Sequence, residues 1–192
     1  MTEFIKINDA VFPENLKLIK NPPKRLFYKG NIELLNSLCF SVIGSRDLTN
    51  YGRQIEKKFV KDLVLRGITI VSGMAVGADC VAHKETLDYG GKTIAVLGSG
   101  FNHIFPQENI ELYNRIIAED GLVITEYEDD ILPNSENFPK RNRIVSGLSL
   151  GLLVVEAKYR SGTSITVKLA KEQGKKIFAF PRKTRYKKWN WC

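Results

Sequence analysis

The 192-residue sequence predicts an α/β fold: a doubly wound, mainly parallel β-sheet with helices on both faces. Three observations favour this class. Six short apolar runs, rich in β-branched residues, alternate with segments of helical periodicity. The runs lack polar alternation, which is typical of parallel strands that are buried on both faces. Several runs end in small residues directly before a helix, as at Gly44-Ser45 and Ser72-Gly73.

Each element follows from its own signals. Thr49 or Asn50 can cap the first long helix, and glycines such as Gly67 and Gly174 end helices. In chain order the sequence predicts strand 40–43, helix 51–66, strand 68–71, helix 78–89, strand 93–97, helix 107–119, strand 122–125, an acidic loop at 126–137, helix 138–146, strand 152–155, a helix capped by residues 161–164 and running to 173, and strand 177–180. Such alternation forms an extended Rossmann-like sheet, whose ligands bind at the carboxyl ends of the strands.

Composition divides the chain into three parts. Residues 1–37 are predicted to be an irregular lead-in, because Asn21-Pro22-Pro23 breaks any helix and only a short extended piece follows at 26–28. We expect this lead-in to pack on a Rossmann-like domain of residues 38–181. Residues 182–192 form a basic and aromatic tail that matches no element of the fold.

Charge and hydropathy limit the function classes. The formal net charge is +8, but five positive charges lie in the last eleven residues, so overall charge is weak support for a nucleic-acid partner. No apolar run could span a bilayer, and the amino terminus lacks the apolar core of a signal peptide, so we expect a cytoplasmic protein without a membrane partner. The three cysteines, Cys39, Cys80 and Cys192, are far apart and predict neither a disulfide framework nor a metal site.

The main binding signal is the turn Gly44-Ser45-Arg46 after the first predicted strand of the domain. A strand that ends in this way leaves backbone N–H groups free at the mouth of the next helix, where the helix dipole also favours anions. The forked guanidinium of Arg46 suits phosphate. The same reasoning gives further candidate phosphate contacts at other strand ends: Ser72, Gly73, Gly98, Gly100, Ser161, Gly162 and Thr163.

A second basic feature is the segment of Lys140, Arg141, Asn142 and Arg143, which stands beside Phe138. Arginines next to an aromatic ring can hold a nucleic-acid backbone while the ring stacks on a base. The alternative interpretation is a solvated, basic start of a helix.

Four further polar residues near strand ends allow two interpretations each. Asp79 and His83 lie four apart on one helix and form either an acid–base pair or half a metal site, or else Asp79 caps the helix and His83 bonds to a neighbouring loop. Glu126 and Glu156 each end a strand and are either catalytic or bonded to an arginine of the basic segment. We favour the site-ordering role for all four and predict no catalytic residue, no metal and no cofactor.

Three enzyme signatures are incomplete in this sequence. Gly98-Ser99-Gly100 begins like a dinucleotide motif, but His103 stands at the third glycine position. Gly91-Lys92-Thr93 resembles the end of a phosphate-binding loop of ATPases, but it enters a strand instead of leaving one. Ser72 lacks the flanking glycines of a hydrolase nucleophile.

Together and in order, these loops resemble the DNA-processing protein A family, also called DprA or Smf. The resemblance runs from about residue 11 to residue 181. It rests on Val42-Ile43-Gly44-Ser45-Arg46, Ser72-Gly73-Met74-Ala75-Val76-Gly77-Ala78-Asp79 with Ala82-His83, Thr93-Ile94-Ala95-Val96-Leu97-Gly98-Ser99-Gly100, Phe138-Pro139-Lys140-Arg141-Asn142-Arg143-Ile144, Val155-Glu156-Ala157 and Ser161-Gly162-Thr163-Ser164-Ile165-Thr166.

The resemblance implies a cytosolic bacterial protein of DNA-mediated transformation, or competence. Such a protein binds incoming single-stranded DNA, protects it and helps to load the RecA recombinase in DNA recombination. It also implies a homodimer without a cofactor. Arg46 matches the arginine of the family's Gly-Ser-Arg loop, which contacts DNA phosphate. Lys140, Arg141 and Arg143 match its basic segment.

The chain departs from the family pattern at a few places. Ala78 stands where the family usually has isoleucine. We expect neither the helical domain that precedes the lead-in nor the winged-helix-like domain that follows. After Pro181 the family continues with a glycine- and serine-rich loop, whereas this chain has Arg182–Cys192. One hypothesis is a slip of the reading frame, which would also shorten the chain. The alternative is an authentic basic-aromatic tail that grips nucleic acid.

Two other functions stay open on this scaffold: a small-nucleotide sensor, and a phosphoribohydrolase-like enzyme similar to the lysine-decarboxylase-like family. The enzyme needs a Pro-Gly-Gly-x-Gly-Thr loop, where this chain has Arg160-Ser161-Gly162-Thr163. The sequence therefore predicts a non-enzymatic, single-stranded DNA-binding module.

Overall fold

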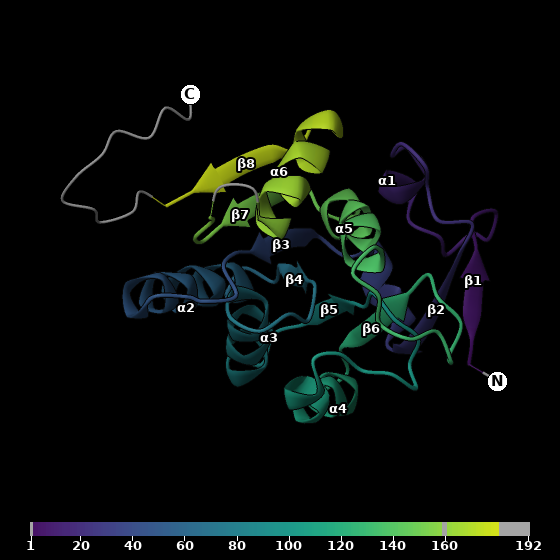
Figure 1. Cartoon of the computed structure of the whole chain (residues 1–192), viewed down its shortest axis with the longest axis horizontal. Helices are drawn as coiled ribbons and strands as arrows, with labels where there is room; N and C mark the ends of the chain where they lie inside the picture. The colour runs from purple at the N-terminus through teal and green to yellow at the C-terminus, as the bar shows by residue number, and fades with distance from the viewer. Residues whose placement is uncertain (1, 159–160, 181–192) are drawn as a thin grey trace.

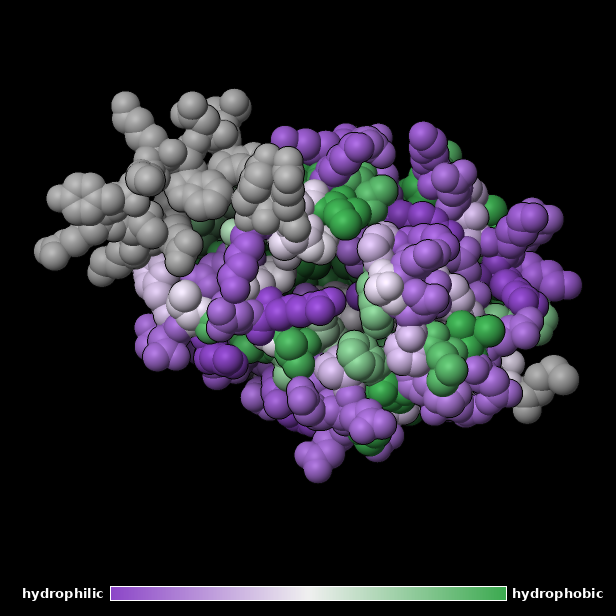
Figure 2. Space-filling model, viewed as in Figure 1, coloured by the Kyte–Doolittle hydropathy of each residue, from purple (hydrophilic) through white to green (hydrophobic). Residues whose placement is uncertain are grey.

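The computed structural model describes residues 2–158 and 161–180 (Figure 1). The predicted tail at 182–192 and the frame-slip hypothesis lie outside these residues. Within the described ranges, no helix is both long and apolar enough to cross a membrane. Hydrophilic side chains cover most of the described surface on the face shown, with hydrophobic patches scattered between them (Figure 2).

The predicted α/β class is confirmed by one eight-stranded sheet in the order β1-β2-β6-β5-β4-β3-β7-β8. The strands are β1 (Phe4–Lys6), β2 (Arg25–Gly30), β3 (Cys39–Ile43), β4 (Thr69–Ser72), β5 (Thr93–Val96), β6 (Leu122–Thr125), β7 (Gly151–Val154) and β8 (Lys176–Ala179). Neighbouring strands from β6 to β8 pair in parallel, whereas β2 pairs antiparallel with both β1 and β6.

Helices cover both faces of this sheet. They are α1 (Glu14–Lys17), α2 (Asn50–Val64), α3 (Ala78–Asp88), α4 (Ile110–Ala118), α5 (Asn137–Leu148) and α6 (Gly162–Glu172), with 3₁₀ turns η1 (Ile32–Asn36) and η2 (Gln107–Asn109). In Figure 1, α2, α3 and α4 lie along one side of the sheet, and α1, α5 and α6 lie along the other.

The hydrophobic core follows this division. On the α5 face, Leu16 of α1, Ile144 of α5 and Ala170 of α6 are fully buried against the strands. On the other face, Val60 of α2 and Ile116 of α4 belong to the clusters that cover the sheet. Burial of these apolar side chains on both faces explains why the strands show no polar alternation.

The chain reverses direction across the sheet between β3 and β7. From β3 to β6 each crossover helix moves the chain to one side, and α5 then carries it back to β7, which pairs with β3 at Val42↔Leu153. The reversal creates a switch point at the carboxyl ends of β3 and β7, where ligands bind in open α/β sheets.

Sequence reasoning missed β1 and predicted only a short extended piece where β2 lies. Both strands come from the lead-in and extend the sheet beside β6, with Phe27 opposite Thr125. The three residues of β1 are too short to show a period. Thr49 caps α2 as predicted, because its hydroxyl accepts a hydrogen bond from Gly52 N at 3.0 Å.

The end of helix α5 also differs from the prediction, because the helix continues past residue 146 to Leu148. Gly147 lies inside the helix, and a Cβ there would be 2.8 Å from Leu16 Cδ1. Glycine at this position permits close packing of α1 on α5 and does not end the helix. The strand β4 also begins one residue later than predicted.

Candidate functional site

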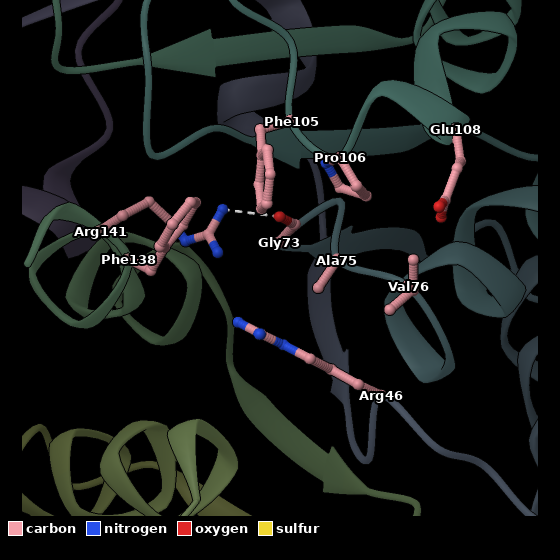
Figure 3. Close-up of a pocket in the computed structure, with 9 residues that line it drawn as sticks. All are labelled: Arg46, Gly73, Ala75, Val76, Phe105, Pro106, Glu108, Phe138 and Arg141. Carbon is pink, nitrogen blue, oxygen red and sulfur yellow. Dashed lines mark hydrogen bonds between the residues drawn. The ribbon is translucent and has the colours of Figure 1, made fainter. Parts of the chain in front are cut away.

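A pocket of about 230 Å³ lies at the carboxyl edge of the sheet, beside the switch point (Figure 3). Its walls come from the loop after β3, the loop after β4, the turn before α4 and the first turns of α5. The lining residues are Arg46, Gly73, Ala75, Val76, Phe105, Pro106, Glu108, Phe138 and Arg141. Of the predicted site residues, Arg46, Gly73 and Arg141 therefore meet in one pocket.

Arg46 is the exposed cation of this pocket. It takes part in none of the ion pairs of the described chain. The adjacent Asp47 carboxylate instead lies 3.3 Å from Lys158 Nζ. The buried Ser45 hydroxyl donates to Asp47 O at 2.9 Å and closes the turn. The guanidinium of Arg46 is thus available to an external anion.

Arg141 is the buried cation, with 5% of its surface exposed. Its Nη1 donates to Gly73 O at 2.7 Å and to Val96 O, which fixes α5 to the ends of β4 and β5. Burial lowers the pKa of Arg141 to about 10, assisted by the positive charge of Arg46 and opposed by Asp79. The group stays cationic at neutral pH, so two guanidinium groups create a positive potential in the pocket.

Gly73 lies between a cation and an anion. A Cβ at this position would be 2.8 Å from both Arg141 Nη2 and Asp79 Oδ2, so only glycine fits without movement of these groups. Asp79 accepts a hydrogen bond from Ala75 N at 3.2 Å and holds the loop in which Met74 adopts a φ of 62°. Burial raises the pKa of Asp79, and Arg141 opposes this shift. These contacts agree with the predicted role of Asp79 in ordering the loop after β4.

His83 is fully buried below this loop. Its Nδ1 lies 2.7 Å from the hydroxyl of Thr93, which itself donates to Ile70 O, so the imidazole donates from Nδ1. Burial lowers the pKa of His83 to about 3, which keeps the ring neutral. The partner is a strand residue and not the neighbouring loop that the sequence suggested. The described residues hold no cluster of three or more His, Cys, Asp or Glu that could bind a metal.

Two phenylalanines form the apolar wall of the pocket. Phe138 lies directly over Gly98, where a Cβ would be 2.7 Å from the ring. The rings of Phe105 and Phe138 are 5.6 Å apart between centroids and inclined by 38°. Phe105 is 46% exposed, so part of this residue is open to a ligand. Aromatic faces at such a site stack on bases or on other planar groups.

The other residues of the basic segment do not line the pocket. Arg143 donates from Nη2 to both oxygens of Glu126, at 2.7 and 2.8 Å, and from Nε to Asn21 O at 2.8 Å. This is the Glu126 contact that the sequence offered as one alternative. Lys140 has a side chain that is 63% exposed, 3.5 Å from Glu136. Asn142 accepts from Arg141 Nε at 3.1 Å.

Glu156 has a different partner from the predicted arginine. Its carboxylate accepts from Thr49 N at 2.9 Å and from the Thr49 hydroxyl at 2.6 Å, and so holds the end of the Arg46 turn at the start of α2. Across the switch point, the Thr163 hydroxyl donates to Gly44 O at 2.8 Å. The loops after β3 and β7 are thus tied together beside the pocket.

The remaining predicted phosphate contacts have internal positions or lie beside the pocket. Ser72 donates to Val42 O at 2.7 Å inside the sheet. A Cβ on Gly100 would clash with Glu128 O, so glycine here lets the acidic loop pass close to the end of β5. Ser161 and Gly162 begin α6 near Asn142, whose Nδ2 lies 3.5 Å from Gly162 O. Their roles as phosphate contacts stay predictions.

Sequence reasoning did not select Phe105, Pro106 or Glu108, although all three line the pocket. The available signal was an aromatic residue before a proline, a few residues after the glycine-rich end of a strand. This signal served only to predict the start of a helix, because nothing in the local pattern shows that the turn folds toward the loop after β4.

The comparisons with known proteins give the family. The profile of the DNA recombination-mediator protein A family matches residues 3–192. The chain belongs to this family. Protein Smf of Escherichia coli (strain K12), a curated relative, is 42% identical over 177 residues, which cover 92% of this chain and 47% of Smf. The DprA proteins of Bacillus subtilis and Streptococcus pneumoniae are covered to 60% and 61%, so the chain spans about half to three fifths of these relatives.

Solved structures of the DprA family agree with the fold. The X-ray structure of DprA from Streptococcus pneumoniae matches with a TM-score of 0.90 and 40% identity, covering 96% of this chain and 64% of that one. The structure of DNA processing protein A from Helicobacter pylori, which concerns its single-stranded DNA binding mode, matches with a TM-score of 0.86 and 30% identity over 96% of this chain and 85% of that one.

Proposed function

We propose that this chain binds single-stranded DNA through the pocket at the carboxyl edge of its sheet. One observation carries the proposal: the exposed guanidinium of Arg46, without an acidic partner in the described chain, faces a pocket whose opposite wall holds Phe105 and Phe138. Phosphate on the arginines and a base on the rings is the combination that single-strand binding proteins use. Membership of the DprA family and the single-strand binding of the Helicobacter pylori relative support the assignment.

We propose that the chain binds single-stranded DNA and does not catalyse a reaction on it. Both strand-end glutamates that the sequence offered as catalytic candidates are engaged: Glu126 with Arg143, and Glu156 with Thr49. His83 is buried and neutral, hydrogen-bonded to Thr93, and thus is not positioned as an acid for an external substrate. These contacts weigh against the phosphoribohydrolase-like alternative.

The wider role of the longer family members is also part of the proposal. We propose that the chain acts in the cytoplasm, in DNA-mediated transformation, as a homodimer that protects single strands and passes them to the RecA recombinase. Chromatography with light scattering tests the dimer. RecA retained on the immobilised chain, with and without bound oligonucleotide, tests the partner.

The decisive experiment is fluorescence anisotropy of a labelled oligo-dT and of its matched duplex at two salt concentrations. We expect the single strand to bind more tightly and the affinity to fall with salt. Arg46→Ala removes one charged phosphate contact, so affinity should fall about tenfold. The slope of log affinity against log salt should fall by about 0.7.

Arg66→Ala is the matched control, because Arg66 is exposed near the end of α2, at the opposite edge of the sheet, and donates to Asp62 O. This variant should bind like the unmodified chain. An unchanged salt slope in Arg46→Ala would contradict the assignment of Arg46. Thermal stabilisation by a mononucleotide, together with no binding of the oligonucleotide, would favour the nucleotide sensor.

A further inference from the structure

The pocket carries opposite charges on two sides. Arg46 and Arg141 supply guanidinium groups, whereas Glu108 adds a carboxylate from η2, which points toward the Val76 side (Figure 3). Glu108 is exposed and takes part in none of the ion pairs of the described chain. A site for phosphate alone gains nothing from an unneutralised carboxylate, which repels anions. The Glu108 side of the pocket therefore favours a ligand group that donates hydrogen bonds.

The position of Glu108 is fixed by its neighbour. Asn109 is 4% exposed and donates from Nδ2 to Met74 O at 2.8 Å, which attaches η2 to the loop after β4. The same loop carries Gly73, Ala75 and Val76 of the pocket wall. The backbone of Glu108 is thus held beside this loop, and its side chain lines the same pocket as the two arginines.

The size and lining of the pocket favour one base. A volume of about 230 Å³ is below the roughly 300–1,000 Å³ of pockets for drug-sized ligands, so it suits a single ring system. Phe105, which is 46% exposed, is the aromatic residue on which a base could stack. Arg46, Phe105 and Glu108 line the same pocket, so a nucleotide that places its phosphate on Arg46 and its base in the pocket shares that space with the carboxylate.

We propose that Glu108 selects the base that enters the pocket and favours guanine over thymine, a proposal that rests on the proposed function. A carboxylate only accepts hydrogen bonds. Guanine presents two adjacent donors, N1–H and the N2 amino group, which match both carboxylate oxygens. Thymine presents one N–H between two carbonyl oxygens, which a carboxylate repels. Adenine and cytosine, with one amino group each, fall between these two.

The test compares oligo-dT with the same oligonucleotide that carries one central guanine, by anisotropy with the full chain. A single guanine avoids self-association of guanine runs. We expect about fivefold tighter binding of the guanine-containing strand, somewhat below the full value of a bidentate base contact because Glu108 is exposed. Glu108→Gln should reduce this preference to less than about twofold and tighten binding of oligo-dT, since a negative charge is lost.

Glu111→Gln is the matched control, because it makes the same charge change on α4 at an exposed residue outside the pocket lining. It should keep the guanine preference. Equal binding of both strands by a chain that binds oligo-dT would overturn the role of Glu108, as would a full preference in Glu108→Gln. No binding of either strand would instead reject the proposed function and this inference with it.

Discussion

The loop after β3 and the start of α5 both present arginine at the same pocket, yet the protein treats them differently. Arg46 is exposed and takes part in none of the described ion pairs, whereas Arg141 is buried on Gly73 O and Val96 O and Arg143 is paired with Glu126. In the described chain, the Arg46 side chain of the first loop makes no ion pair. In the second region, Arg141 and Arg143 use their donors in hydrogen bonds within the protein. The arginines should therefore differ in how much each contributes to the free energy of unfolding.

The largest effect should come from Arg141→Met. The substitution leaves two strand-end carbonyl groups without their donor and removes the cation that faces buried Asp79. Loss of buried, charge-assisted hydrogen bonds should lower the free energy of unfolding by about 3 kcal/mol. Urea denaturation measures this. Arg66→Met, at an exposed arginine far from the pocket, should stay within about 0.5 kcal/mol of the unmodified chain. An equally stable Arg141→Met would remove the distinction between the two regions.

A smaller loss is expected for Arg143→Met. The Arg143 side chain is 14% exposed and the Glu126 side chain is 26% exposed, so water already screens part of the interaction. Stability should fall by about 1.5 kcal/mol. In a double-mutant cycle with Glu126→Gln, the two losses should not add, because both remove one contact. Simple additivity would mean that the pair contributes no coupling.

The smallest effect belongs to Lys140→Ala, because this side chain is 63% exposed and its ion pair with Glu136 is long. Stability should change by less than about 0.5 kcal/mol. If Lys140 contacts DNA phosphate, oligo-dT affinity should fall about threefold. The matched control is Lys168→Ala, at an exposed lysine with a similar pairing to Glu172 on α6. Equal affinities of the two variants would place Lys140 outside the interface.

The sequence predicted the parallel part of the fold well because its signals are local. Buried β-branched runs, glycine ends and the Thr49 cap need no knowledge of distant residues. The antiparallel strand β1 could not be predicted, because three residues are too few to show the alternation of a strand. It is defined by its pairing with β2, which local sequence does not reveal. The choice between catalysis and ordering for Glu156 also depended on a distant partner, Thr49, which no spacing reveals.

The pocket, too, could be predicted only where local sequence signals sufficed. Arg46 and Gly73 could be selected because they follow strands whose carboxyl ends share one edge of the sheet. The burial of Arg141 could not be predicted, since a run of basic residues is equally consistent with a solvated helix start. Glu108 lines the pocket beside Asn109, whose side chain donates to Met74 O, a contact between segments far apart in the chain.

The pairing of β2 with β6 has a consequence for synthesis of the chain. Tyr28 lies opposite Ile124, so an early strand cannot complete its ladder until most of the parallel sheet has left the ribosome. Non-local pairing of this kind slows folding and leaves a strand edge open in the meantime. Leu26 and Phe27, both buried in the finished sheet, would be exposed to solvent during this interval.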